Sequence, residues 1–261
     1  MIRVGLIGCG AIGSSIARVI DEDFDEVDLV AVFDRDIDKA LELVKKLKRS
    51  RPRVTSSIEE MLEQSIDLVI EAASPEAVER YIVDIVARGK SIVVLSSGAF
   101  LNRDLLQKTI QIAENTGARI YIPSGAIGGI DILKAASLLD INELVLTTRK
   151  NPKALGLDNI DKPLTIFEGD VIEAVKRFPL NINIAATIAL ATNKTPIVKI
   201  IADPNTNENI HEIYAKGLFG EIRIEIRNKR IDEKSRSSLI TVFSVLQLLK
   251  QLSRKNLTIG T

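Results

Sequence analysis

The chain has 261 residues and a mass of 28.6 kDa, and 46% of its residues are hydrophobic, which suffices for one large or two modest domains. Lys plus Arg and Asp plus Glu each number 35, so no net charge draws the protein to nucleic acid or to an anionic membrane. The N-terminal residues lack a secretory pattern, no apolar run reaches membrane-spanning length, and the single cysteine, Cys9, excludes an intramolecular disulfide and a cysteine-cluster metal site. We therefore expect a cytoplasmic protein without a metal.

Strand-like and helical patterns alternate over the first half of the chain. Apolar runs predict buried strands at 2–7, 28–34, 67–74, 91–97 and 118–125. Apolar residues at helical spacing predict helices between these strands, at 11–20, 36–48, 75–88 and 102–116. Strands that alternate with helices at this interval indicate βαβ units and hence a parallel sheet with both faces covered. The prediction is an α/β domain with a Rossmann-type doubly wound parallel sheet over residues 1–123.

The pattern changes after about residue 140. In the stretch 220–229, Ile222, Ile224 and Ile226 alternate with charged residues, which is typical of an antiparallel sheet with one wet face. Further strands are predicted at 141–150 and 196–204, and covering helices at 169–178 and 183–192. These elements predict a second, α+β domain over 124–235 with a mostly antiparallel sheet. An amphipathic helix begins near residue 234, and we expect 236–261 to complete the first domain.

A glycine motif follows the first predicted strand and opens the first helix. Gly8, Gly10 and Gly13 form a GxGxxG run that lies 21 residues before Asp34, the last residue of the second strand. In dinucleotide sites the first glycine permits a tight turn, the second admits the pyrophosphate, the third lets the helix pack on the strand, and the acid accepts hydrogen bonds from the ribose hydroxyls. The motif predicts a dinucleotide site to which Ala11 and Ile12 also belong.

The residues around this motif bear on the choice of cofactor. Asp34 repels a 2′-phosphate and so favours NAD, whereas Arg35 beside it could accommodate that phosphate and permit NADP. Bound dinucleotide normally passes the carboxyl end of the third strand, where Ala72, Ala73 and Ser74 stand. Their small side chains fit close approach of a ligand and ordinary packing equally well. Cys9 has no evident base partner, and we expect it to be a packing residue.

Several stretches beyond the glycine motif share one resemblance. They are GLIGCGAIG at 5–13, PSGAIGGID at 123–131, TTRKNP at 147–152, FPLNINIAATIALA at 178–191 and IADPNTNENIHEI at 201–213. In order along nearly the whole chain, they resemble the L-aspartate dehydrogenase family. The resemblance implies a Rossmann domain joined to an α+β domain and NAD(P)-dependent oxidation of L-aspartate to iminoaspartate, which hydrolyses to oxaloacetate and ammonia. It further implies that His211 is catalytic and that Ala126 and Asn183 contact the cofactor.

His211 is the only histidine in the chain. From the residues alone, a packed or exposed residue where a polar turn meets a strand is the better interpretation, and the resemblance reverses this preference. Hydride leaves aspartate only when its amine is neutral, so a base with a pKa near 7 would serve, and it could later activate water against the imine. Arg149 and Lys150 are candidates for the substrate carboxylates, although a solvated strand end explains them equally well. Asp131 fits helix capping better than catalysis.

Two other classes of function stay open from the sequence. One is a related two-domain oxidoreductase acting on another small acid, such as a homoserine dehydrogenase or a dihydrodipicolinate reductase, although the latter's histidine pair is absent. The other is a non-catalytic NAD-binding sensor, which the glycine motif and Asp34 fit as well as they fit an enzyme. By family analogy and the general frequency of dimers, we expect a homodimer formed through the open sheet.

Overall fold

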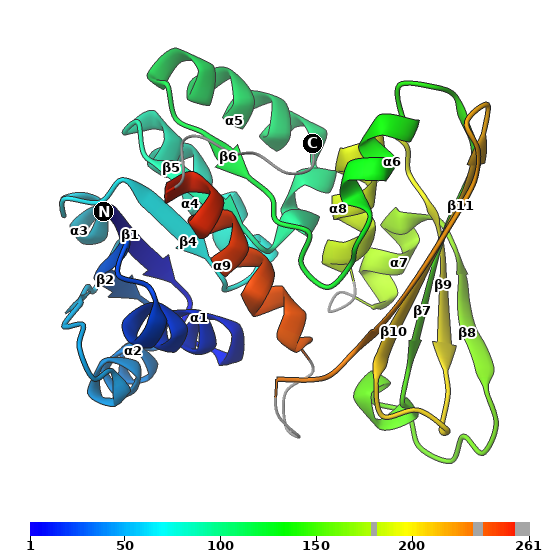
Figure 1. Cartoon of the computed structure of the whole chain (residues 1–261). Coiled ribbons are helices and arrows are strands. Elements are labelled where there is room, and N and C mark those ends of the chain that lie inside the picture. Colours follow the sequence, from blue (N-terminus) through cyan, green and yellow to red (C-terminus); the bar gives the residue numbers. More distant parts are fainter. Residues whose placement is uncertain (179–181, 232–236, 254–261) are drawn as a thin grey trace. The chain divides into compact units, whose positions relative to one another are not determined.

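The computed structural model describes residues 1–178, 182–231 and 237–253. The chain folds into two compact units (Figure 1). Among the described residues, the first unit comprises Met1–Gly125 and Thr241–Ser253, and the second lies within Ala126–Ile240. No helix in the described ranges is both long and apolar enough to cross a membrane.

The first unit is built on a six-stranded parallel sheet of order β3-β2-β1-β4-β5-β6. Its strands are β1 (Ile2–Ile7), β2 (Val27–Phe33), β3 (Arg53–Val54), β4 (Leu68–Glu71), β5 (Ser91–Val94) and β6 (Ile120–Tyr121). The helices are α1 (Ala11–Asp23), α2 (Ile37–Lys46), α3 (Ile58–Leu62), α4 (Pro75–Ala87), η1 (Ser97–Leu101), α5 (Arg103–Thr116) and α9 (Leu239–Ser253), the last belonging to this unit from Thr241. The strand order reverses beside β1, so right-handed crossovers place helices on both faces of the sheet.

Local sequence signals explain where these helices begin and end. The Ser74 hydroxyl accepts a hydrogen bond from the Ala77 amide at 3.3 Å, and Pro75 occupies the first helical position of α4. Asn102 caps α5 in the same way, and Gly117 ends that helix in the left-handed conformation at φ +74°. Apolar side chains of the central strands, such as Val4 and Ile70, are fully buried.

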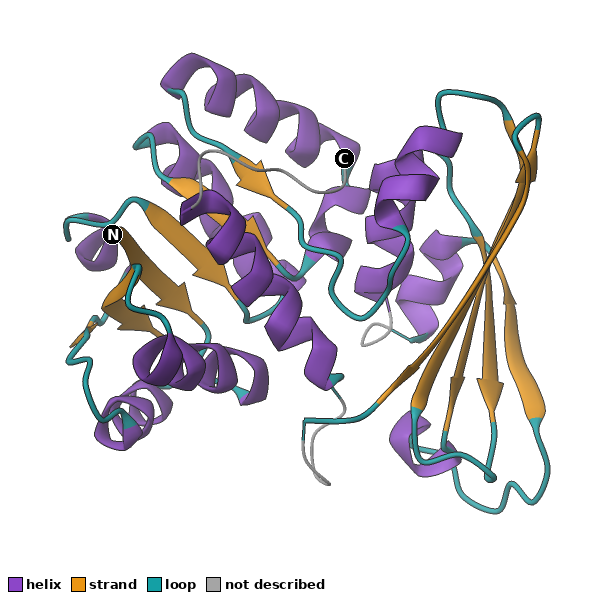
Figure 2. Cartoon of the chain, viewed as in Figure 1, coloured by secondary structure: helices purple, strands orange, loops and turns teal. Residues whose placement is uncertain are grey.

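The second unit carries a five-stranded sheet of order β11-β10-β7-β9-β8, antiparallel except for the pairing of β7 with β9. Its strands are β7 (Ile141–Lys150), β8 (Leu164–Gly169), β9 (Ile197–Ala202), β10 (Asn209–Gly217) and β11 (Gly220–Asn228). Its helices are α6 (Ile130–Ala136), η2 (Pro152–Leu155), α7 (Val171–Arg177) and α8 (Ile182–Thr192). Figure 2 shows α6, α7 and α8 on one face of this sheet. The charged residues of β11 alternate with its isoleucines and are exposed, so they point to the opposite face.

The predicted fold class is confirmed, with differences at short elements. β3, α3 and β8 were not predicted. A strand of two residues and a helix of five carry too little periodicity to stand out, and β8, with six residues, has exposed residues at both ends and no regular alternation of buried positions. The strand predicted at 118–125 is reduced to Ile120–Tyr121, since Pro123 and the left-handed Gly125 turn the chain away from the sheet. Residues 232–236 and 254–261, which include parts of the predicted last helix, lie outside the described residues.

Candidate functional site

The glycine turn of the first unit has the geometry of a nucleotide cradle. Gly8 adopts φ +93°, and a Cβ there would lie 2.6 Å from the carbonyl oxygen of Ala72. A Cβ on Gly13 would overlap the carbonyl oxygen of Gly8, so only glycine lets α1 pack this closely on the turn. Gly10 is the N-cap of α1, and a Cβ there would meet nothing within 4 Å. The N-terminus of α1 is therefore open to an anion.

Asp34 stands directly after β2 and is fixed in place by two backbone amides. Its Oδ2 accepts a hydrogen bond from the Cys9 amide at 2.7 Å, and its Oδ1 accepts one from the Asp36 amide at 2.9 Å. A carboxylate has about four lone-pair positions, so it can still accept ribose hydroxyls. Burial, and then the charge of Asp34, raises the pKa of the Cys9 thiol to about 12. Cys9 is thus a protonated packing residue, as expected, and its amide holds the acid.

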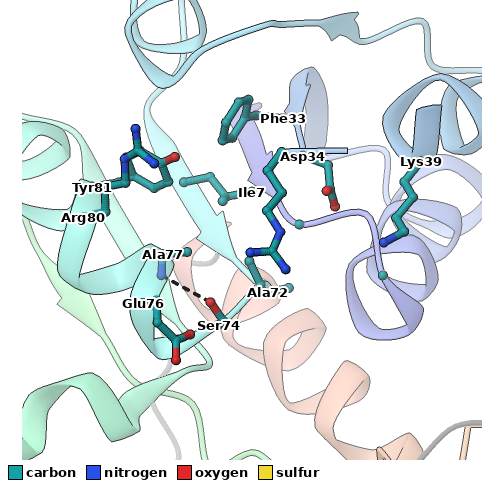
Figure 3. A pocket seen from close by; sticks show the side chains of 14 residues that line it. Ile7, Phe33, Asp34, Lys39, Ala72, Ser74, Glu76, Ala77, Arg80 and Tyr81 are labelled. Carbon is teal, nitrogen blue, oxygen red and sulfur yellow. Dashed lines mark hydrogen bonds between the residues drawn. The ribbon is translucent and has the colours of Figure 1, made fainter. Parts of the chain in front are cut away.

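A cavity of about 300 Å³ opens at the carboxyl ends of β1, β2 and β4 (Figure 3). Its lining includes the predicted residues Gly8, Gly10, Asp34, Arg35, Ala72, Ala73 and Ser74, but not Ala11, Ile12 or Gly13. The other lining residues were not predicted from the sequence; they are Ile7, Phe33, Lys39, Glu76, Ala77, Arg80 and Tyr81. Ile7 and Phe33 end β1 and β2, whereas the other five lie on α2 and α4, which only the tertiary fold brings beside the glycine turn.

The charges in this cavity suit a dinucleotide. Arg35, Lys39 and Arg80 contribute three cations to the lining, against the acids Asp34 and Glu76. Asp34 can accept the hydroxyls of an adenine ribose, and the cations can attract its phosphates. The glycine cradle, the helix N-terminus and the acid together fit the cofactor that the sequence predicts.

Glu71, the last residue of β4, is a buried acid that the sequence analysis overlooked. Its Oε1 accepts hydrogen bonds from the Ala73 amide and the Ser96 hydroxyl, both at 2.8 Å, and its Oε2 accepts one from the Ser96 amide at 2.9 Å. Burial raises the pKa of Glu71, against the opposing effect of these hydrogen bonds. The side chain ties the turn after β4, which lines the cavity, to the turn after β5. An acid ending an otherwise apolar strand was the available signal.

His211 lies in the second unit, within β10 and between the neighbouring strands β7 and β11. It is opposite Thr148 on one side and Ile226 on the other, and only 1% of its surface is exposed. Its Nδ1 is hydrogen-bonded to the Thr148 hydroxyl at 3.1 Å. Burial, and then the positive charge of Lys150, lowers the pKa of His211 to about 3. The pKa of His211 therefore lies below the value near 7 that we expected for a base, and its imidazole is neutral at pH 7.

The two cations proposed for the substrate carboxylates lie on opposite faces of the sheet. Side chains alternate along a strand, so Lys150 shares the face of Thr148 and His211, where it is 9% exposed. Arg149 points to the other face and is paired with Asp203 at 3.2 Å and Glu212 at 3.7 Å. Of these two cations, Lys150 is the one whose charge contributes to the lowered pKa of His211.

More buried polar side chains surround this end of the sheet. Asn209 and Asn228 are directly paired in register, and both lie on the His211 face because each is two residues from a member of the pair formed by His211 and Ile226. The Asn228 side-chain amide donates to the Ala126 carbonyl at 2.8 Å, which fixes the predicted cofactor residue Ala126 beside this strand. The covered face of the second unit therefore ends in a cluster of polar groups, not in an apolar core.

The part of the PSGAIGGID motif that belongs to the second unit, residues 126–129, packs onto the same face. Gly129 has φ +71°, and a Cβ there would overlap the side chain of Ile224. Only glycine at this position therefore lets the motif approach β11 this closely. Asp131 is exposed in the first turn of α6, as its capping interpretation requires. Asn183 lies in the first turn of α8, and α8 packs beside α6.

A second cavity, of about 450 Å³, lies beyond the end of β7 and contains none of the predicted site residues. It is lined by residues 151–154 and 157–160 together with Pro204, Asn207 and Arg230. In the described part of the chain, no three His, Cys, Asp or Glu side chains are grouped as a metal site.

The fold and the nucleotide cavity define a class of protein. A parallel sheet of order 3-2-1-4-5-6, a glycine turn before α1 and an acid after β2 are the features of dinucleotide-binding Rossmann proteins. The family model described as homoserine dehydrogenase, NAD binding domain, matches residues 8–123. The family model described as aspartate dehydrogenase, C-terminal, matches residues 131–252. The first unit is thus an NAD-binding domain, and the second separates the chain from homoserine dehydrogenases.

Full-length relatives agree with the second match. The chain is 40% identical to an L-aspartate dehydrogenase from Methanothermobacter thermautotrophicus, over 100% of this chain and 99% of the relative. It is 38% identical to one from Methanocaldococcus jannaschii, over 97% of each chain. The crystal structure of aspartate dehydrogenase from Thermotoga maritima is similar with a TM-score of 0.80 and 30% identity, covering 100% of both chains. The chain belongs to the aspartate dehydrogenase family, which confirms the resemblance seen in its sequence.

Proposed function

We propose that the protein oxidises L-aspartate with NAD or NADP to iminoaspartate, which water converts to oxaloacetate and ammonia. The observation that carries this proposal is the buried pair of His211 and Lys150 in a second unit whose sequence matches aspartate dehydrogenases throughout. A cation and a neutral imidazole on one face suit a small substrate that carries carboxylates beside a reacting amine.

The first unit holds the cofactor in this proposal. The turn from Gly8 to Gly13, with the Ala11 and Ile12 amides at the start of α1, binds the pyrophosphate, and Asp34 accepts the adenine ribose hydroxyls. NAD is the preferred form, because Asp34 opposes a 2′-phosphate. Arg35, with Lys39 and Arg80, supplies the charge that makes NADP a second cofactor. When bound, the cofactor supplies the acceptor for the hydride.

The remaining cofactor contacts that we propose come from residues 72–74 and, in the second unit, from Ala126 and Asn183. The dinucleotide contacts Ala72, Ala73 and Ser74, since these residues line the cavity. Ala126 and Asn183 contact the cofactor by family analogy. Ala126 is held in place for this role by the hydrogen bond from Asn228 to its carbonyl.

The second unit binds the substrate in this proposal. Lys150 takes a carboxylate of aspartate, and His211 contacts the substrate next to it as the catalytic residue. Arg149 is the other candidate for a carboxylate, on the opposite face of the sheet, where it pairs with Asp203 and Glu212. A bound carboxylate would offset the charge of Lys150 and thereby remove one of the two causes that lower the pKa of His211.

The proposal extends to the setting of the enzyme. We place it in the cytoplasm as a homodimer, with iminoaspartate feeding the synthesis of quinolinate and then NAD. The face of the second sheet opposite α6, α7 and α8 supports self-association, since two such faces can pair by matching Arg223 and Arg227 with Glu221 and Glu225 of a second copy. Light scattering at micromolar concentration tests this, and a monomeric mass would refute the dimer.

A panel of amino acids distinguishes the proposed function from its alternatives. The purified protein with NAD or NADP is given L-aspartate, D-aspartate, L-glutamate, L-asparagine and L-homoserine, and absorbance of the reduced cofactor is followed. We expect turnover with L-aspartate far above that with the others. Turnover of L-homoserine instead would support the related oxidoreductase, and cofactor binding without any turnover would support the sensor.

A further inference from the structure

The imidazole of His211 makes one hydrogen bond within the described ranges, and this bond decides which ring nitrogen is free. Its Nδ1 lies 3.1 Å from the Thr148 hydroxyl, and Nε2 has no partner among those residues. No fully enclosed side-chain nitrogen or oxygen of the described residues lacks a partner. Nε2 is therefore not fully enclosed, although only 1% of His211 is exposed, and it is the ring nitrogen that remains for a ligand.

The hydrogen atom of the Thr148 hydroxyl determines the direction of the bond. Thr148 is 2% exposed, and within the described part of the chain His211 is the only hydrogen-bond partner of its side chain. If Nδ1 carried the proton, the Thr148 hydroxyl would accept that bond and its own hydrogen would be buried without an acceptor. A buried donor without an acceptor is strongly disfavoured, because it loses its hydrogen bond to water and gains none. The hydroxyl therefore donates to Nδ1, and the neutral ring carries its proton on Nε2.

We propose that Thr148 is a positioning residue that holds His211 in the Nε2–H tautomer, so that His211 donates a hydrogen bond to a substrate carboxylate beside Lys150. Lys150 supplies the charge and His211 the directed N–H, which together recognise one carboxylate more specifically than either alone. The substrate part of this statement rests on the proposed function, whereas the tautomer does not.

The proposal changes the path expected for the proton of the substrate amine. An imidazole that donates from Nε2 and accepts at Nδ1 has no free lone pair with which to deprotonate an ammonium group. The amine then loses its proton to solvent before hydride transfer. The rate of NADH formation should rise with pH as the amine of aspartate loses its proton. Between pH 5 and 8, the pH profile of Thr148→Val should keep every step that the wild type shows.

The protein's single histidine permits a direct test of the tautomer. Protein grown with ¹⁵N-labelled histidine gives NMR signals from His211 alone, and the nitrogen shifts and their couplings to the ring protons identify the protonated nitrogen. We expect a protonated Nε2 and a hydrogen-bonded, unprotonated Nδ1 in the ligand-free full chain at pH 7. A protonated Nδ1 would overturn the proposal without any variant being made.

Two matched variants test the role of the hydroxyl. Thr148→Val removes it with little change of shape, whereas Thr148→Ser keeps it. We expect Thr148→Val to shift the Nδ1 signal and to raise the KM for L-aspartate about tenfold, the loss of one directed hydrogen bond, with the Kd for NAD unchanged. Thr148→Ser should resemble the wild type in all three measurements, and circular dichroism checks that both variants fold.

The outcomes separate the two parts of the proposal. An unchanged His211 spectrum in Thr148→Val would overturn the positioning role. The proposed tautomer combined with an unchanged KM would overturn the carboxylate contact. If the wild type does not oxidise L-aspartate at all, the proposed function fails, while the NMR result still decides the tautomer.

Discussion

Acidification should destabilise the protein through its one histidine. The pKa of His211 is lowered from 6.5 to about 3 on folding, chiefly because the side chain is buried. A histidine whose pKa is lowered by folding contributes stability that is complete above the unfolded-state pKa and is lost as the pH falls. Below pH 6.5 His211 is protonated in the unfolded chain but stays neutral in the folded protein until the pH approaches 3.

The magnitude follows from the interval between the two pKa values. Each pH unit below 6.5 costs about 1.36 kcal/mol, so the free energy of unfolding should fall by about 2 kcal/mol between pH 7.5 and pH 5. The loss by pH 5 depends on the unfolded chain, because folded His211 is still neutral there. Glu71 acts in the opposite sense, since its raised pKa favours the folded state at low pH and this contribution is lost as the pH rises.

Comparison with a variant isolates the contribution of His211. Urea unfolding of the wild type and of His211→Asn, followed by far-ultraviolet circular dichroism at several pH values, gives the difference between their unfolding free energies. This difference should change by about 2 kcal/mol in disfavour of the wild type from pH 7.5 to pH 5, because the contribution of Glu71 cancels. A difference that stays constant with pH would refute a buried, neutral His211.

Three further outcomes follow from the first unit. Glu71→Gln should lower the free energy of unfolding by about 1–3 kcal/mol in urea titrations, because an amide leaves at least one of the three donors from Ala73 and Ser96 without an acceptor; an unchanged midpoint would contradict the role of the carboxylate. Cys9 should resist iodoacetamide at pH 8 in the folded protein and react in urea, as mass spectrometry can show, since its thiol is buried and has a pKa of about 12; rapid labelling of the folded protein would argue against this. Asp34→Asn should raise the Kd for NAD about tenfold relative to that for NADP, measured by fluorescence, and an unchanged ratio would remove Asp34 from cofactor choice.

Much of the first unit could be predicted because its signals are local. Continuous apolar strands, amphipathic helices and the glycines at 8, 10 and 13 each carry their own periodicity or steric requirement. The cavity could only be predicted in part, since Lys39 and Arg80 come from two helices that meet the glycine turn through the tertiary fold. Glu71 was missed because an acid at a strand end has no distinctive pattern until Ser96 is placed beside it.

In the candidate site of the second unit, the positions of Arg149 and Lys150 could have been predicted from the sequence, whereas the pKa of His211 could not. The alternation of side chains along 141–150 already implied that Arg149 and Lys150 face opposite ways, so their separation was predictable. The lowered pKa of His211 was not, because it depends on burial and on Lys150, a residue 61 positions earlier in the chain. Registers between distant strands bring such groups together, and sequence periodicity does not specify them.

The central claim is that His211 acts in the oxidation of L-aspartate, and one comparison tests it most directly. The rate of NADH formation from L-aspartate is measured for the wild type and for His211→Ala, alongside the Kd of each for NAD. The account predicts that the variant binds NAD as the wild type does and loses most of its turnover. A variant that oxidises L-aspartate at the wild-type rate would contradict it.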